Sequence, residues 1–273
     1  MTSREDDALA QAAVTALTGQ LALAPKPGLP DPRDLDARST RREHDSLRWS
    51  ARALAPGLAA MAASARRTGE ATPALRAELG AIGRCTEHSV GLAGGGHKGA
   101  LWALGFLVAA AALDPRATAR EIAANARKIA AFNDKGAPRR PSRGSSISVK
   151  YGAAGARGEA RAGFPHVRRA LDALATARRA GATENQARLD ALLTVMSTLQ
   201  DTELLYTAGP LGLRQVQAGA RAVLEAGGTA TRPGATALTA LDAELHERGW
   251  SPRGSAGLMA GALFLDGLSA APL

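Results

Sequence analysis

Several residue types are scarce in this 273-residue chain, and each shortage excludes a class of protein. The single cysteine, Cys85, excludes a disulfide framework or a cysteine metal cluster and favours a reducing compartment. Aromatic residues make up only 3% of the chain, and no valine-rich alternating run is present, which excludes an all-β sandwich or barrel. The uncharged run at residues 99–113 is 15 residues long, shorter than the roughly 20 that cross a bilayer.

The N-terminal residues also lack the basic start of a secretory signal, because Glu5, Asp6 and Asp7 stand there. We therefore expect no signal peptide and no membrane span. Together with the cysteine usage, these features predict a cytoplasmic protein.

Alanine is abundant, with 63 residues, and the apolar and charged fractions of 45% and 22% are those of a globular protein. This composition predicts a single all-α domain over residues 1–273, with nine to eleven helices. Apolar spacing and Gly or Pro breaks place helices at 8–24, 43–67 (with a break at Pro56-Gly57), 73–88, 100–113, 116–132, 165–180, 185–207, 210–226, 235–248 and 253–267. Residues 29–42 and 133–158 are predicted to be irregular, and the apolar 100–113 helix to be the buried centre of the fold.

Positive charge is concentrated in one part of the chain. The formal net charge is +9, and residues 114–188 hold 16 basic and 6 acidic residues, a local net charge of +10. Such a segment indicates an anionic partner: nucleic acid, a membrane surface or a phosphorylated small molecule.

A glycine-rich segment precedes the central helix. Gly94, Gly95 and Gly96 would let a phosphate approach the backbone at a helix start, with Lys98 and Gly99 beside it. The segment is not a Walker A loop, because His97 separates Gly96 from Lys98 and no Ser or Thr follows the lysine. The alternative is a flexible connection between two helices.

Further candidates are charged residues in unusual settings. Lys26, between two prolines and followed by Pro27-Gly28, can hold a charge toward a phosphate; the alternative is a helix terminator with a solvated lysine. Glu159 lies between Arg157 and Arg161, which would keep it ionised for magnesium binding or proton transfer; the alternative is a helix-capping cluster.

Asp201 stands in an apolar stretch, where a carboxylate is costly unless it is paired or bound to metal; the alternative is that it faces solvent. Arg143 is well placed for a ligand, together with Arg139 and Arg140. The other histidines, His44, His88, His166 and His246, show no metal-ligand spacing and are taken as structural or surface residues.

In order along the chain, these motifs resemble the triphosphoribosyl-dephospho-CoA synthase family. The segments that carry the resemblance are Pro25-Lys26-Pro27-Gly28-Leu29, residues 97–105, Tyr151-Gly152, Arg157-Gly158-Glu159-Ala160, residues 162–165, Asp201-Thr202 and Leu204-Leu205. Residues 188–193 and 216–224 are more similar to the malonate decarboxylase branch than to the citrate lyase branch. The sequence departs from the family pattern at Ser39 and Arg41 (usually His and Asp), at residues 93–96 (usually Gly-Val-Asn-Thr), and at Glu203 and Tyr206-Thr207 (usually Asn and His-Arg).

The resemblance implies an all-helical enzyme that takes ATP and 3′-dephospho-CoA, forms 2′-(5″-triphosphoribosyl)-3′-dephospho-CoA and releases adenine. The product is the precursor of a prosthetic group on an acyl-carrier subunit. In this hypothesis Lys26, Lys98 and the amides of residues 94–96 bind phosphate, Glu159 and Asp201 bind Mg²⁺ or act as general base, and His97 binds phosphate or transfers a proton. The expected nucleotide site is completed by Gly28, Gly99, Arg143, Arg157 and Arg161.

Two alternatives remain open from the sequence. The first is a related protein without catalytic activity that binds ATP or a CoA-type nucleotide. The second is a helical nucleic-acid-binding protein, although the chain has no helix-turn-helix signature and few aromatic residues on which bases could stack.

Overall fold

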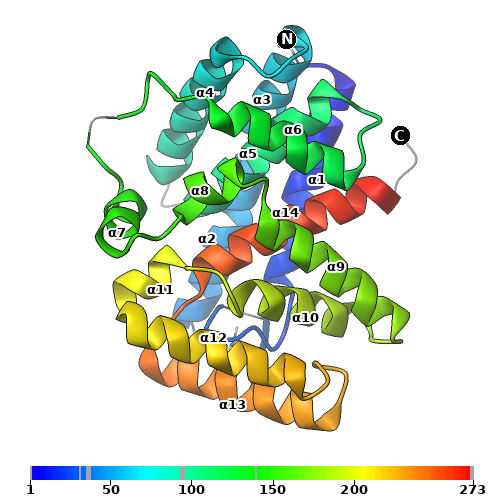
Figure 1. Ribbon diagram of the computed structural model, residues 1–273, viewed down its shortest axis with the longest axis vertical. Coiled ribbons are helices and arrows are strands. Elements are labelled where there is room, and N and C mark those ends of the chain that lie inside the picture. The colour runs from blue at the N-terminus through cyan, green and yellow to red at the C-terminus, as the bar shows by residue number, and fades with distance from the viewer. Residues whose placement is uncertain (1, 31, 35–37, 93–95, 139, 271–273) are drawn as a thin grey trace.

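The computed structural model of the chain is all-α, as the composition predicts (Figure 1). It describes residues 2–30, 32–34, 38–92, 96–138 and 140–270, and it has no strand within them. These ranges hold fourteen α-helices and one short 3-10 helix, η1 (Pro32–Asp34), so the expectation of nine to eleven helices was too low.

Local capping explains where several helices begin. The first residues of α1 (Arg4–Leu21), α6 (Ala119–Ala131) and α10 (Glu184–Met196) are each preceded by a Ser or Thr that completes a capping box with an acid or Gln three positions later. Two otherwise unsatisfied backbone N–H groups are bonded in each box, which stabilises the helix start.

Helix α5 (Lys98–Leu113) is the buried centre of the fold, as predicted. Its residues from Ala100 to Ala112 are buried on nearly every side by α3 (Ala55–Thr68), α6 and α14 (Arg253–Ala270). Small residues allow the helices to approach closely: a Cβ added at Gly105 would lie 2.6 Å from the Met61 sulfur. The alanine-rich composition is therefore the composition of tightly packed helices.

Three predicted segments were wrong in detail. The region predicted to be irregular at 133–158 contains α7 (Arg143–Tyr151) and the start of α8 (Gly155–Arg161). Helix α7 buries none of its residues, so it has no apolar periodicity from which it could be predicted. The predicted helix at 185–207 is two helices, α10 and α11 (Thr202–Thr207), because Asp201 caps a new helix start. Helix α2 (Arg38–Ala53) begins inside the predicted 29–42 loop.

The remaining helices extend this packing. Helix α4 (Pro73–Leu92) packs on α3 and α5, while α9 (Pro165–Arg179) packs on α10 and α14. Helices α12 (Gly209–Glu225) and α13 (Arg232–Arg248) lie side by side at one end of the molecule (Figure 1). None of the described helices is long and apolar enough to span a membrane.

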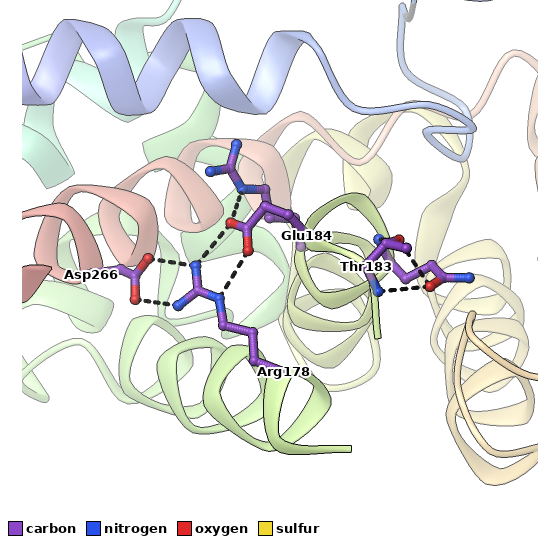
Figure 2. Close-up of polar contacts among 6 residues, drawn as sticks. Arg178, Thr183, Glu184 and Asp266 are labelled. Atoms are coloured by element: carbon purple, nitrogen blue, oxygen red, sulfur yellow. Dashed lines mark hydrogen bonds and ion pairs between the residues drawn. The ribbon is translucent and has the colours of Figure 1, made fainter. Parts of the chain in front are cut away.

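An ion network fixes the far end of α14. Figure 2 shows Arg178 of α9 between Asp266 of α14 and Glu184 of α10. The guanidinium donates to both oxygens of Asp266 at 2.7 and 2.8 Å and to both oxygens of Glu184 at 2.8 and 2.9 Å, and Arg188 donates to Glu184 at 2.6 Å. The bonds to Asp266, and then those to Glu184, raise the pKa of Arg178 above its ordinary value.

We expect Arg178→Met to lower the free energy of unfolding by about 1 kcal/mol and the Tm by roughly 2–4 °C, because two carboxylates would lose the cation between them. Thermal unfolding followed by circular dichroism measures the change. Arg168→Met removes an exposed arginine from the same helix and should leave the Tm unchanged. Equal Tm values for the two variants would contradict a stabilising role for the network.

Candidate functional site

The start of α5 presents His97. This residue is the N-cap and adopts a left-handed conformation with φ 66°. Its Nε2 lies 2.9 Å from the Leu47 carbonyl oxygen, which accepts the bond and so fixes the proton on Nε2. Burial lowers the pKa of His97 below its ordinary value, and the charges of Lys26 and Arg253 lower it further, while the bond to Leu47 opposes the shift. His97 is therefore a neutral hydrogen-bonding group close to two cations.

Lys26 is one of these cations and is almost fully buried, at 1% exposure, so the solvated-lysine alternative is wrong. Its Nζ donates to the main-chain oxygen of Gln20 at 3.2 Å and to Gln20 Oε1 at 3.4 Å. A buried ammonium group held by two oxygens keeps its position, and its charge acts on His97 through a medium of low dielectric constant.

Gly28 holds the turn after Lys26 against α13. It has φ 62°, and a Cβ there would lie 2.2 Å from the Trp250 carbonyl oxygen. Its N–H donates to Asp242 Oδ1 at 3.3 Å, so this glycine serves the packing of the turn and its amide is directed to a carboxylate. The nucleotide-binding role predicted for Gly28 stays a prediction, and these contacts favour a structural one.

Asp201 connects two helix starts. Its Oδ2 accepts bonds from the Ser255 N–H at 2.9 Å and the Ser255 hydroxyl at 3.2 Å, and its Oδ1 accepts from the Glu203 N–H at 3.0 Å. A Cβ at Gly254 would lie 2.9 Å from this carboxylate, so only glycine fits there. Asp201 is 2% exposed, which makes the solvent-facing alternative wrong. Burial raises its pKa, and the bonds from Ser255 and Glu203 oppose the rise.

The first turns of α5 and α14 meet beside these groups. A Cβ added at Gly257 would lie 3.4 Å from the Ala100 nitrogen. Arg253, the first residue of α14, lowers the pKa of His97 by its charge and pairs with Glu43 of α2 at 2.8 Å. Because a helix N-terminus attracts anions, the start of α5 together with the charges of Lys26 and Arg253 makes a site suited to phosphate.

The glycine-rich segment is only partly described. Gly94 and Gly95 lie outside the described residues. A Cβ at Gly96 would lie 3.0 Å from the Leu47 side chain, whereas Gly99 has open space around it. The exposed Lys98 pairs with Glu87 at 3.4 Å, at the edge of the site.

Glu159 pairs with a histidine. Its Oε1 accepts the His166 N–H at 2.8 Å, and its Oε2 accepts from His166 Nδ1 at 2.7 Å. The carboxylate is 5% exposed and caps α9, whose N-cap Phe164 has no side-chain acceptor. Arg157 and Arg161 turn the other way and donate to Asn133 Oδ1, at 2.7 and 2.8 Å, beyond the end of α6. The flanking arginines therefore do not hold Glu159 as expected.

Arg143 joins α7 to α11. Its guanidinium donates to Glu203 Oε2 at 2.7 Å and lies 4.7 Å from the centre of the Tyr206 ring. The start of α7 also approaches Thr202, because a Cβ at Gly144 would lie 3.7 Å from the Thr202 hydroxyl. Arg143 thus reaches the element that Asp201 caps, next to the first turn of α14.

The structure brings some predicted residues together and separates others. Lys26 lies near enough to His97 for its charge to lower the pKa of the histidine. Asp201 and Arg253 both lie at the first turn of α14. Arg157 and Arg161 face α6 instead. An open hollow of about 640 Å³ lies at the opposite end of α5, beside Leu113 and Asp114, and no predicted site residue lines it.

Comparison with known proteins decides the family. The family model of ATP:dephospho-CoA triphosphoribosyl transferase matches residues 6–272. The chain belongs to the ATP:dephospho-CoA triphosphoribosyl transferase family. Three relatives named "Probable 2-(5''-triphosphoribosyl)-3'-dephosphocoenzyme-A synthase" are 47% identical (Stutzerimonas stutzeri), 46% (Pseudomonas aeruginosa) and 46% (Azotobacter vinelandii). The alignments cover 96%, 97% and 95% of this chain and 92%, 92% and 90% of the relatives. No solved structure matches.

The carboxylates of this transferase family member are not arranged around a metal. Among the described residues, no group of three or more His, Cys, Asp or Glu side chains is placed to hold an ion. Both oxygens of Glu159 and of Asp201 already accept protein hydrogen bonds. Their assignment to Mg²⁺ stays a prediction; in this structure their contacts fit helix capping and not metal ligation.

Sequence reasoning missed two residues beside the predicted ones: Arg253, whose charge acts on His97, and His166, which pairs with Glu159. One signal for Arg253 was available. Helices α5 and α14 begin with Lys98 and Arg253 and hold no acid in the first turn, where a cation opposes the helix dipole. The pairing of His166 with Glu159 depends on the left-handed turn at Phe164, which the sequence does not reveal.

The lowered pKa of His97 makes a pH prediction. The unfolded chain binds a proton near the ordinary histidine pKa of about 6.5, whereas folded His97 binds it only at lower pH. The stabilising contribution is thus complete above about pH 6.5 and is lost as the pH falls toward the folded pKa. His97→Asn, which tolerates the left-handed backbone, should show a smaller fall of Tm than the wild type between about pH 7.5 and 5.5.

Exposed His88 provides the control, since His88→Asn should keep the wild-type dependence. If His97→Asn also keeps it, His97 does not have a lowered pKa in the folded state.

Proposed function

We propose that the chain transfers the triphosphoribosyl group of ATP to the 2′-hydroxyl of 3′-dephospho-CoA and releases adenine. The family match and the names of the relatives support this reaction. The main structural support is the junction of α5 and α14, because its helix end and cations attract anions.

The triphosphate of ATP is assigned to that junction. Lys26 contributes a fixed charge, and Arg253, with a side chain 57% exposed, can turn from Glu43 toward a phosphate. The first N–H groups of α5, which have no partner within the helix, add hydrogen-bond donors without further charge. Mg²⁺ would enter bound to the triphosphate, whose charge it offsets; we assign it no protein ligand.

Proton transfer is assigned to His166, with Glu159 as the positioning residue. Because Glu159 accepts from Nδ1, the ring presents Nε2 as the acceptor for a proton. In the proposed step the 2′-oxygen bonds to C1′ of the ATP ribose while its proton passes to Nε2. The bond from C1′ to adenine breaks, and adenine leaves with the electron pair and takes up a proton.

The biological setting is also part of the proposal. We assign the product to the prosthetic group of a malonate decarboxylase acyl-carrier subunit, because residues 188–193 and 216–224 resemble that branch. Residues 1–273 would act as one nucleotide-binding transferase domain in the cytoplasm.

The reaction is tested by incubating the protein with ATP, magnesium and 3′-dephospho-CoA and measuring free adenine. We expect adenine release, reduced roughly tenfold or more in Arg253→Gln because a charge-assisted phosphate contact is lost. Arg168→Gln, which removes an exposed charge elsewhere, should match the wild type. ATP binding without adenine release would instead support a non-catalytic nucleotide-binding protein.

His166→Asn should lower kcat by about 100-fold or more, the usual contribution of a general base. Added imidazole should restore part of the activity to His166→Ala. Glu159→Gln should lose less activity than His166→Asn, because the amide oxygen can still accept the Nδ1 proton and hold the ring in place. Unchanged kcat with a lowered Tm in these variants would limit the pair to capping α9.

A further inference from the structure

A second group of cations lies between α4, α8 and the turn after α6. We call Arg76, Arg84, Arg157 and Arg161 the arginine cluster. Arg76 and Arg84 both pair with Asp134, at 3.4 and 2.5 Å, and Arg157 and Arg161 share Asn133 one residue earlier.

Two glycines leave room in the backbone for the side chains of this cluster. A Cβ at Gly80 of α4 would lie 2.2 Å from Asp134 Oδ2, and one at Gly136 would lie 2.7 Å from Arg84 Nη2. Arg76 lies over the Phe106 ring at 5.2 Å, which fixes its plane. The cluster is therefore a constrained arrangement rather than a chance meeting of surface side chains.

Positive charge in the cluster exceeds negative charge. Of the four guanidinium groups, those of Arg76 and Arg84 share the Asp134 carboxylate, while those of Arg157 and Arg161 donate to the neutral Asn133. The Arg76 Nε is buried without a hydrogen bond to any described residue. Burial lowers the pKa of Arg76, and the charges of Arg157 and Arg84 add to the lowering that Asp134 opposes. Like charges in a half-buried site are unfavourable until an anion joins them.

The position of the cluster relates it to the junction of α5 and α14. Lys98 and Phe106 are eight residues apart on α5, a distance of about 12 Å along the helix axis. Trp102 lies between them and donates to Glu87. The junction of α5 and α14 and the arginine cluster therefore lie along the same side of α5.

We propose that the arginine cluster binds the diphosphate group of the acceptor nucleotide. Guanidinium groups recognise phosphoryl oxygens through paired N–H donors, and Arg84 and Arg157 are accessible from solvent. Two phosphate sites along one helix would leave the two riboses between them, where the transfer occurs. The identity of this ligand rests on the proposed function, whereas diphosphate binding itself does not.

Calorimetric titration of the full chain with inorganic diphosphate tests the site. We expect two classes of binding site in the wild type. Arg157→Gln, an exposed position that keeps the fold, should weaken one class about tenfold, and Arg84→Gln should do the same. Arg253→Gln should weaken the other class, and Arg168→Gln neither. Asp134→Asn should tighten the cluster class, because it removes the internal competitor for the arginines.

Two results would contradict diphosphate binding by the arginine cluster. The first is unchanged diphosphate binding in Arg84→Gln and Arg157→Gln. The second is weaker diphosphate binding in Asp134→Asn, which would show that the arginines and Asp134 form a self-contained ion network. Separate titrations with 3′-dephospho-CoA and ATP identify the ligand. Loss of 3′-dephospho-CoA affinity alone in Arg157→Gln supports the acceptor, and loss of ATP affinity alone overturns that assignment. Because these are binding measurements, a failure to release adenine would reject the proposed function and leave the diphosphate site standing.

Discussion

The buried carboxylate of Asp201 is the contact on which the site geometry depends. It accepts backbone N–H groups from the starts of α11 and α14 together, so two segments more than fifty residues apart share one acceptor. A buried carboxylate without such partners would be strongly unfavourable. Because Gly254 leaves no room for a side chain beside it, the first turn of α14 is held against Asp201, and the charge of Arg253 acts on His97 from that position.

The placement of charge follows two different rules in this molecule. At α1, α6 and α10 an acid or amide in the first turn completes a cap and satisfies the helix end internally. The start of α5 has no such cap, because its N-cap His97 makes no side-chain hydrogen bond to the helix, which leaves this helix end favourable to a ligand that carries negative charge. Internal capping thus serves the scaffold, and the uncapped start of α5 is the end assigned to the proposed substrate.

The helical class and the buried centre could be predicted because apolar composition and spacing report directly on burial. Lys26 and His97 were found from local pattern, and they do lie near each other. What could not be predicted was pairing over long sequence distances: Asp201 with Ser255, or Asp134 with Arg76 and Arg84. The direction of Arg157 and Arg161 also depended on the short turn of α8, since flanking an acid in sequence does not mean facing it in space.

Helix α14 is bonded at both ends. Ser255 is held by Asp201, and Asp266 is held by Arg178, two points roughly 16 Å apart along the axis. The helix cannot slide along α5 without breaking one of these sets of bonds. The junction that would receive a triphosphate is accordingly preorganised in its backbone: the start of α5 and the buried Lys26 are already in place before a ligand arrives, so little of the binding energy is spent on arranging them.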